Sequence, residues 1–190
     1  MNANEYSDGY EDRDICYDCD HKCSECDCVC KFERIPKPLK PNRTRLKCGT
    51  SSGTLVFPVE TPAGVTFTLA TVNVDTKRMK QPCIQLEFAN NIITTDATII
   101  LNFQVFKQCR NQLTPIPVGP IWTFSPSTEE TEGNTIGNTF SFYVCDCDTT
   151  CDECCIYSVV VTQAGITTTG ITTIINSSFA AVIVDGACNY

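Results

Sequence analysis

From residue 54 onward, apolar and polar residues alternate along much of the chain. The alternation is most regular in residues 66–74 and 98–106, where Val, Ile, Leu and Phe recur at nearly every second position. This is the period of a β-strand with one buried face. Similar shorter stretches occupy residues 54–59, 84–88, 121–124, 139–144, 157–162, 171–175 and 179–184. The sequence shows no convincing 3.6-residue apolar period, so the pattern predicts an all-β fold.

Turn-forming residues separate these stretches. They are Pro62-Ala63-Gly64, Asn90-Asn91, residues 115–120, residues 133–137 and Asn176-Ser177-Ser178. About eight short strands joined by such turns predict a jelly-roll-like sandwich of two sheets. Trp122, the only tryptophan, is expected to anchor the core or a sheet end. Alternation assigns to the core, with Trp122, the residues Phe57, Phe67, Leu69, Val72, Leu86, Phe88, Leu101, Phe103, Val105, Phe124, Phe140, Phe142, Val159, Val161, Ile174, Val182 and Val184.

Charge divides the chain into three zones. Residues 1–30 hold nine acidic residues against two basic ones, residues 31–47 hold seven basic residues against one acidic, and residues 48–190 hold five basic against twelve acidic. We therefore expect an acidic, cysteine-rich connector (1–30), a basic tether (31–47) and the sandwich domain (48–190). Pro36, Pro38 and Pro41 predict an extended tether, neither helix nor paired central strand. It is either a solvated linker or an arm lying along the acidic body of a neighbouring copy.

The net charge of −8 argues against nucleic acid as the main partner. No apolar run approaches the length of a membrane span, and residues 1–14 lack the basic start and apolar middle of a signal peptide. Yet fifteen cysteines are typical of an oxidising environment, or of a reduced chain that binds metal. One resolution is release by lysis of the producing cell, as with spore-coat material, and the other is a reduced metal-binding protein.

The first cysteine cluster is Cys16, Cys19, Cys23, Cys26, Cys28 and Cys30. A zinc site formed by Cys16, Cys19, Cys23 and Cys26 remains an alternative, although its two CxxC pairs are closer together than in zinc ribbons. Cys26, Cys28 and Cys30 alternate, so in an extended chain their thiols project to one side. This geometry favours crosslinking to another subunit, and the odd number of cysteines leaves at least one without a partner in its own chain.

The second cluster is Cys145, Cys147, Cys151, Cys154 and Cys155. It is expected to form a loop at strand ends, with Cys154 and Cys155 pointing in opposite directions to different partners. The remaining cysteines, Cys48, Cys83, Cys109 and Cys188, are dispersed at predicted strand ends, where disulfides within the chain are plausible. With His21 as the only histidine and no phosphate-binding glycine motif, we predict no enzymatic activity and no cofactor.

Several motifs resemble a clostridial family of cysteine-rich domains of unknown function. They are Cys48-Gly49-Thr50, Ile84-Gln85-Leu86-Glu87-Phe88, residues 103–107 with Cys109, Trp122-Thr123-Phe124, Phe140-Ser141-Phe142 with Cys145-Asp146-Cys147, and Cys154-Cys155-Ile156-Tyr157. The layout is also similar to subunits of endospore appendages, jelly-roll proteins whose cysteine-bearing N-terminal connector bonds to preceding subunits. The resemblance implies that the connector cysteines crosslink subunits, with Cys83, Cys109 and Cys188 as receivers. Cys48, Cys145, Cys147, Cys151, Cys154 and Cys155 are then the candidates for bonds within the chain.

These observations predict a structural subunit. It would assemble with copies of itself, by strand addition and through the N-terminal arm, into a disulfide-crosslinked filament outside the cell or on the spore surface. The main alternative is a surface protein that binds zinc or copper through its cysteine-rich head. A third interpretation, a surface module that binds carbohydrate, would use Trp122 and Tyr143.

Overall fold

The computed structural model describes residues 10–15, 31–36, 44–77, 79, 81–110, 112–126, 133–147, 154–165 and 169–185. The chain divides into two compact units, residues 1–41 and 42–190, and each is described by itself. In the first unit, β1 (Tyr10–Ile15) and β2 (Lys31–Pro36) form an antiparallel two-stranded sheet. The predicted tether is therefore extended in β2, but its backbone there is paired with β1.

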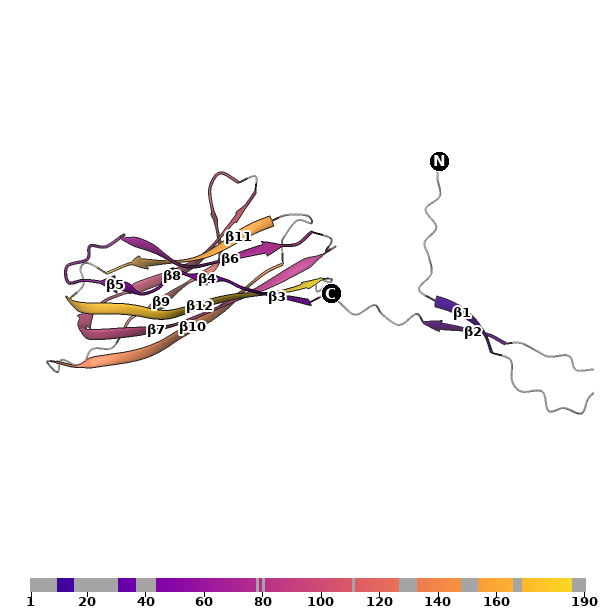
Figure 1. The fold of residues 1–190 in the computed structure, drawn as a ribbon, viewed down its shortest axis with the longest axis horizontal. Coiled ribbons are helices and arrows are strands. Elements are labelled where there is room, and N and C mark those ends of the chain that lie inside the picture. Colours follow the sequence, from indigo (N-terminus) through magenta and orange to yellow (C-terminus); the bar gives the residue numbers. More distant parts are fainter. Residues whose placement is uncertain are drawn as a thin grey trace, which may run out of the picture. The chain divides into compact units, whose positions relative to one another are not determined.

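The second unit is a sandwich of two five-stranded antiparallel sheets (Figure 1). Sheet I contains β3 (Thr44–Cys48), β5 (Leu55–Phe57), β7 (Pro82–Thr98), β10 (Thr135–Asp146) and β12 (Thr169–Asp185). Sheet II contains β4 (Thr50–Ser51), β6 (Thr66–Asp75), β8 (Leu101–Cys109), β9 (Ile116–Phe124) and β11 (Cys154–Gln163). The sandwich begins with Thr44, inside the segment predicted as a tether.

The strand order is that of a jelly roll. In sheet I the order is β10-β7-β12-β3, with β5 also paired to β12, and in sheet II it is β4-β6-β11-β8-β9. Without the short strands β4 and β5, the strands β3 and β6 to β12 can be lettered B to I in chain order. The sheets then read BIDG and CHEF, which is the strand order produced by two Greek keys. The predicted all-β, jelly-roll-like sandwich is confirmed.

The chain passes from one sheet to the other at Gly49. Cys48, at the end of β3, pairs with β12 in sheet I, whereas Thr50 in β4 pairs with β6 in sheet II. The Gly49 amide donates a hydrogen bond to the Phe179 carbonyl oxygen at 2.7 Å. A Cβ atom at this position would collide with the Thr71 carbonyl oxygen and lie 2.9 Å from that of Phe179. Only glycine leaves room for both backbones.

Two of the predicted turns lie inside strands. Asn90-Asn91 is in the middle of β7, and Asn176 and Ser177 form an irregularity within β12, where the pairing with β7 shifts between Ile175 and Ser178. This bulge reverses which alternate residues face the core. Ile174 is buried before it, and Phe179, Ala181 and Ile183 are buried after it.

The predicted core therefore needs correction in the last strand. Val182 and Val184 are half-buried and alternate with the buried residues of β12, so they face outward. Phe67 is 37% exposed, although its ring packs edge-on against Phe57 with centroids 5.5 Å apart. The third predicted turn, residues 115–120, overlaps β9, which accommodates Pro117 and Pro120 because it is the edge strand of sheet II.

Candidate functional site at the cysteine-bearing end of the sandwich

Most described cysteines gather at one end of the sandwich, which we call the cysteine-bearing end. There β8, β10 and β12 end while β3, β7 and β11 begin. Cys83, Cys109, Cys145, Cys147, Cys154 and Cys155 all lie at or beside these strand ends. The topology thus brings together cysteines that are far apart in the sequence.

Two disulfides staple this end. Cys83 bonds to Cys147, and Cys109 bonds to Cys155, each pair with Cα atoms 4.0 Å apart. The strand registers explain both bonds, because Asp146 lies opposite Ile84 on β10 and β7, and Cys155 lies opposite Cys109 on β11 and β8. Each disulfide therefore joins neighbouring strands of a single sheet.

These bonds change the assignment of the body cysteines. Cys83 and Cys109 were predicted to bond between subunits, and the structure instead joins each within the chain, because adjacent strands hold their partners directly opposite. Cys147 and Cys155 supply the other halves, in bonds within the chain. Of the other predicted site residues, Cys16, Cys19, Cys23, Cys26, Cys28, Cys30, Cys151 and Cys188 lie outside the described residues.

Three cysteines of the described sandwich are free and exposed, namely Cys48, Cys145 and Cys154. They were predicted to form bonds within the chain. Cys145, Gln85 and Val182 share one row across the outer face of sheet I, and Cys48 is on the next row at the opposite edge. Three strand spacings of ~4.8 Å separate the β10 and β3 edges, too far for a disulfide between Cys145 and Cys48.

Cys154 and Cys155 point to opposite faces of β11, as predicted. Cys155 is buried and bonded to Cys109, whereas Cys154 is exposed on the outer face of sheet II. The bonded cysteine of this adjacent pair thus belongs to the interior, and the free one to the surface.

A buried polar network connects the two sheets beside the disulfides. The Lys107 ammonium on β8 lies 2.9 Å from Asp146 Oδ2 on β10, with each side chain only 9% exposed. The Tyr157 hydroxyl on β11 donates a hydrogen bond to the same oxygen at 2.7 Å. Lys107 and Tyr157 are directly opposite each other in sheet II. The network therefore links sheet II to sheet I, which neither disulfide does.

Sequence reasoning did not identify this network, although a signal was present. On β8, Leu101, Phe103 and Val105 are buried, and Lys107 is the next residue on the same side of the strand. On β10, Asp146 is likewise the next residue on the same side as the buried Phe142 and Val144. A lysine and an aspartate at inward positions of two different strands predict a buried ion pair, because an uncompensated buried charge is costly.

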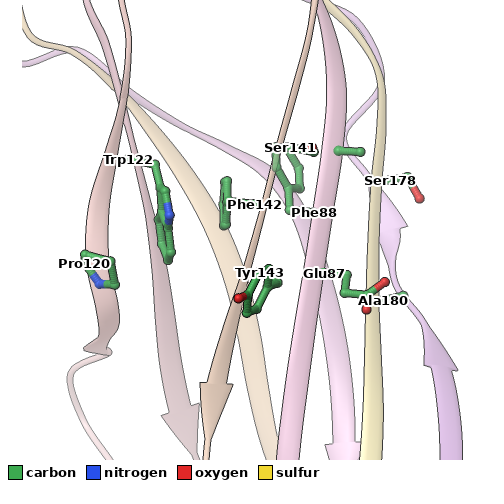
Figure 2. A pocket seen from close by; sticks show the side chains of 10 residues that line it. Glu87, Phe88, Pro120, Trp122, Ser141, Phe142, Tyr143, Ser178 and Ala180 are labelled. Carbon is green, nitrogen blue, oxygen red and sulfur yellow. The ribbon is translucent and has the colours of Figure 1, made fainter.

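A groove of about 870 Å³ lies beside β10 (Figure 2). Trp122 of β9 stacks on Phe142 of β10 with ring centroids 4.1 Å apart, and both rings pack against the core. Figure 2 also shows Tyr143, Glu87 and Ala180 in one row across sheet I, in agreement with their register. One face of Trp122 is thus occupied by Phe142, which supports its predicted role as an anchor of the core or of a sheet end.

The described residues contain neither a metal-binding cluster nor a helix that could span a membrane. Within the described ranges, no group of three or more His, Cys, Asp or Glu side chains is arranged to hold a metal ion. The alternative zinc ligands Cys16, Cys19, Cys23 and Cys26, like His21, fall outside those ranges. The described part of the chain also contains no helix of the length and hydropathy needed to cross a membrane.

Comparison with solved structures finds low-identity similarity. A structure of infectious bursal disease virus, Gt strain, matches 84% of this chain and 37% of its own at 13% identity and a TM-score of 0.41. The Gx strain of the same virus matches 100% and 42% at 11% identity and a TM-score of 0.42. Eiger TNF from S. frugiperda matches 78% and 94% at 9% identity and a TM-score of 0.38. The chain thus spans less than half the length of the viral chains it matches.

No curated protein matches the chain. A family model does, over residues 42–184, which includes the sandwich with both disulfides and the Lys107–Asp146 pair. The chain therefore belongs to the family described as domain of unknown function (DUF4489).

Proposed function

We propose that the chain is a structural subunit that assembles with copies of itself into a disulfide-crosslinked filament outside the cell or on the spore surface. The observation that carries this proposal is the presence of exposed thiols on a body that is already stapled internally. Cys48, Cys145 and Cys154 remain free and exposed beside two formed disulfides. Free surface thiols on an oxidised protein are the groups available for bonds to another chain.

The free edge of β10 supports assembly by strand addition. Among the described strands, β10 pairs only with β7, so one side of its twelve residues has no partner strand. Its one charged residue, Asp146, is buried in the ion pair with Lys107. Long edge strands without surface charge or proline are templates for pairing with another chain. By contrast, Pro117 and Pro120 interrupt the donor groups of the β9 edge.

The charge distribution supports a role for the N-terminal segment between subunits. The basic residues of the tether are complementary to the acidic body of another copy, and the connector of residues 1–30 carries six cysteines. Contacts of this kind between different surfaces of identical chains form open filaments unless they close into a ring. Crosslinks between subunits would also keep the filament from dissolving on dilution.

Electron microscopy of the full-length chain tests the proposal. The reduced protein is moved into an oxidising glutathione buffer and imaged beside a sample kept in reductant. We expect filaments of uniform width in the oxidised sample, resistant to denaturant until reductant is added. Isolated particles at every protein concentration in the oxidised sample would contradict the proposal.

A further inference from the structure

A second pocket, of about 600 Å³, opens at the cysteine-bearing end on the outer face of sheet II. Its lining includes Cys154 and Ile156 of β11, Asp75 of β6 and Arg110, which follows β8. Lys47 of β3 also contributes. The pocket therefore combines a free thiol on β11 with charged groups from three other strands or strand ends.

The thiol is presented beside an apolar side chain. Cys154 lies opposite Asp75 on β6, and Ile156, two residues along the same face, is 48% exposed. The Cys109–Cys155 disulfide lies in the same lining. An extended peptide placed here would contact Ile156 while one of its own side chains reaches the Cys154 sulfur.

The described lining of this pocket holds two basic side chains, Lys47 and Arg110, and one carboxylate, that of Asp75. The Asp75 Oδ1 accepts a hydrogen bond from the Lys77 amide at 2.9 Å, and the Arg45 guanidinium donates one to the Asp75 backbone carbonyl oxygen at 3.5 Å. Neither Lys47 nor Arg110 forms an ion pair with any side chain in the described part of the chain. Among the described lining residues, basic side chains thus outnumber acidic ones by two to one, on a chain whose net charge is −8.

The chain itself contains a segment with the complementary chemistry. Residues 16–30 hold six cysteines and the four acids Asp18, Asp20, Glu25 and Asp27, against the single base Lys22. We infer that this pocket binds residues 16–30 of a second copy and that Cys154 forms a disulfide with one of the cysteines in that segment. The inference rests on the proposed function and names the receiving site within it.

The other two free thiols are less suited to an acidic segment. On the outer face of sheet I, Cys48 shares its row with Glu87, and Cys145 is on the next row beside Gln85. Gln85 donates a hydrogen bond to the Glu87 carboxylate at 2.7 Å, but no cation of the described residues pairs with that carboxylate. Glu87 would repel a further acidic segment there, whereas the described lining beside Cys154 offers two basic side chains against the one carboxylate of Asp75.

The bond needs an oxidant, which we take to be a low-molecular-weight disulfide. The thiolate of one cysteine attacks that disulfide, forming a mixed disulfide and releasing one small thiol after protonation. The second thiolate then attacks the protein sulfur of the mixed disulfide and releases the other small thiol. In total, two protein S–H bonds are replaced by one S–S bond, and one small disulfide is reduced to two thiols.

Isotope mixing locates the bond. Equal amounts of ¹⁴N- and ¹⁵N-labelled full-length chain are reduced, mixed, oxidised with glutathione disulfide, blocked with N-ethylmaleimide and digested without reductant. Mass spectrometry should find the peptide with Cys154 and Cys155 linked both to the Cys109 peptide and to a peptide from residues 16–30. Random pairing should make half of these links join chains of different isotope.

Charge variants test the role of the basic pocket. Arg110→Glu should slow the crosslinking rate roughly tenfold at low salt, within the range of electrostatic steering. Arg110→Lys is the matched control, because it changes the same side chain but keeps its positive charge, and it should leave the rate within about twofold. Added salt should bring the two variants together.

The outcomes separate the inference from the proposed function. Links between chains that avoid Cys154, or that persist unchanged in Cys154→Ser but vanish in Cys48→Ser, would overturn the inference and leave the crosslinked filament intact. Cys154 links found only between segments of the same isotope would overturn it too, because the segment would then belong to its own chain. If no bond between chains forms at all, the inference and the proposed function both fail.

Discussion

Lys107 and Asp146 form an ion pair at 2.9 Å between two strands that belong to different sheets. Tyr157 donates a hydrogen bond to the same carboxylate oxygen, so the buried charges are both paired and hydrogen-bonded. The two disulfides act within single sheets. The cohesion of the sandwich at this end therefore depends on the ion pair in addition to apolar packing.

Replacing Asp146 with Asn should destabilise the domain strongly. The substitution leaves the buried Lys107 ammonium without a countercharge, at a cost of about 3–5 kcal/mol in the free energy of unfolding. Urea denaturation with the disulfides intact measures the change. The exposed Glu60→Gln is the control and should change stability by less than about 0.5 kcal/mol. A loss below about 1 kcal/mol for Asp146→Asn would show that Lys107 finds another partner or reaches water.

Removing the Cys83–Cys147 disulfide should lower stability without preventing assembly. The bond closes a sequence separation of 64 residues, for which the loss of chain entropy corresponds to ~4 kcal/mol. The double variant Cys83→Ala with Cys147→Ala, compared with Cys48→Ala by thermal denaturation, measures the effect. Filaments should still form at temperatures where the double variant is folded. Loss of crosslinking in the folded double variant would indicate that these cysteines bond between chains.

Gly49→Ala should destabilise the crossing between the sheets. The added methyl group collides with backbone atoms rather than with a flexible side chain, and overpacking of this kind costs about 1–3 kcal/mol or more. Gly137→Ala is the matched control, because nothing lies within 4 Å of its Cβ position. If both variants unfold at the same denaturant concentration, Gly49 does not lie as close to the backbone oxygens of Thr71 and Phe179 as described.

Asp75 should titrate below the ordinary value of 3.8. Its pKa is lowered chiefly by the Lys77 amide, with further contributions from the Cys154 thiol and from the charges of Lys77 and Arg45, while desolvation opposes the shift. Because the pKa of Asp75 is lowered in the folded state, the ionised carboxylate stabilises that state. This contribution is complete above pH 3.8 and is lost as the pH falls through the lowered pKa.

Carboxyl-carbon NMR measures this titration directly. Cys154→Ala should move the Asp75 pKa part of the way back toward 3.8, because the thiol hydrogen bond is removed and the Lys77 amide remains. An Asp75 pKa at or above 3.8 in the parent chain would contradict the described geometry of this loop.

Alternation predicted the fold class because one buried face repeats along most strands. It failed at the β12 bulge, where Asn176 and Ser177 exchange the inward and outward positions, so that the half-buried Val182 faces outward. A bulge depends on pairing with β7, which local sequence does not encode. The cysteines show the same limit. Adjacent Cys154 and Cys155 were correctly separated by strand geometry, but the partners of Cys83 and Cys109 follow from which strands are neighbours.

The burial of Lys107 and of Asp146 could have been predicted from the sequence, since each residue continues the alternation of buried residues on its strand. Their contact could not be predicted from the sequence, because it requires β8 and β10, which belong to different sheets, to face each other. Cys83 and Cys109 were misassigned as receiving cysteines for a related reason. Strand order determines which thiols form disulfides within the chain, and therefore which thiols remain exposed.

Denaturing electrophoresis without reductant tests the central claim most directly. The full-length chain is oxidised, its free thiols are blocked with N-ethylmaleimide, and the sample is boiled in detergent before it is run. We predict a ladder of covalent oligomers extending to species too large to enter the gel, which reductant collapses to the monomer band. A single monomer band without reductant would contradict a filament held together by disulfides between subunits.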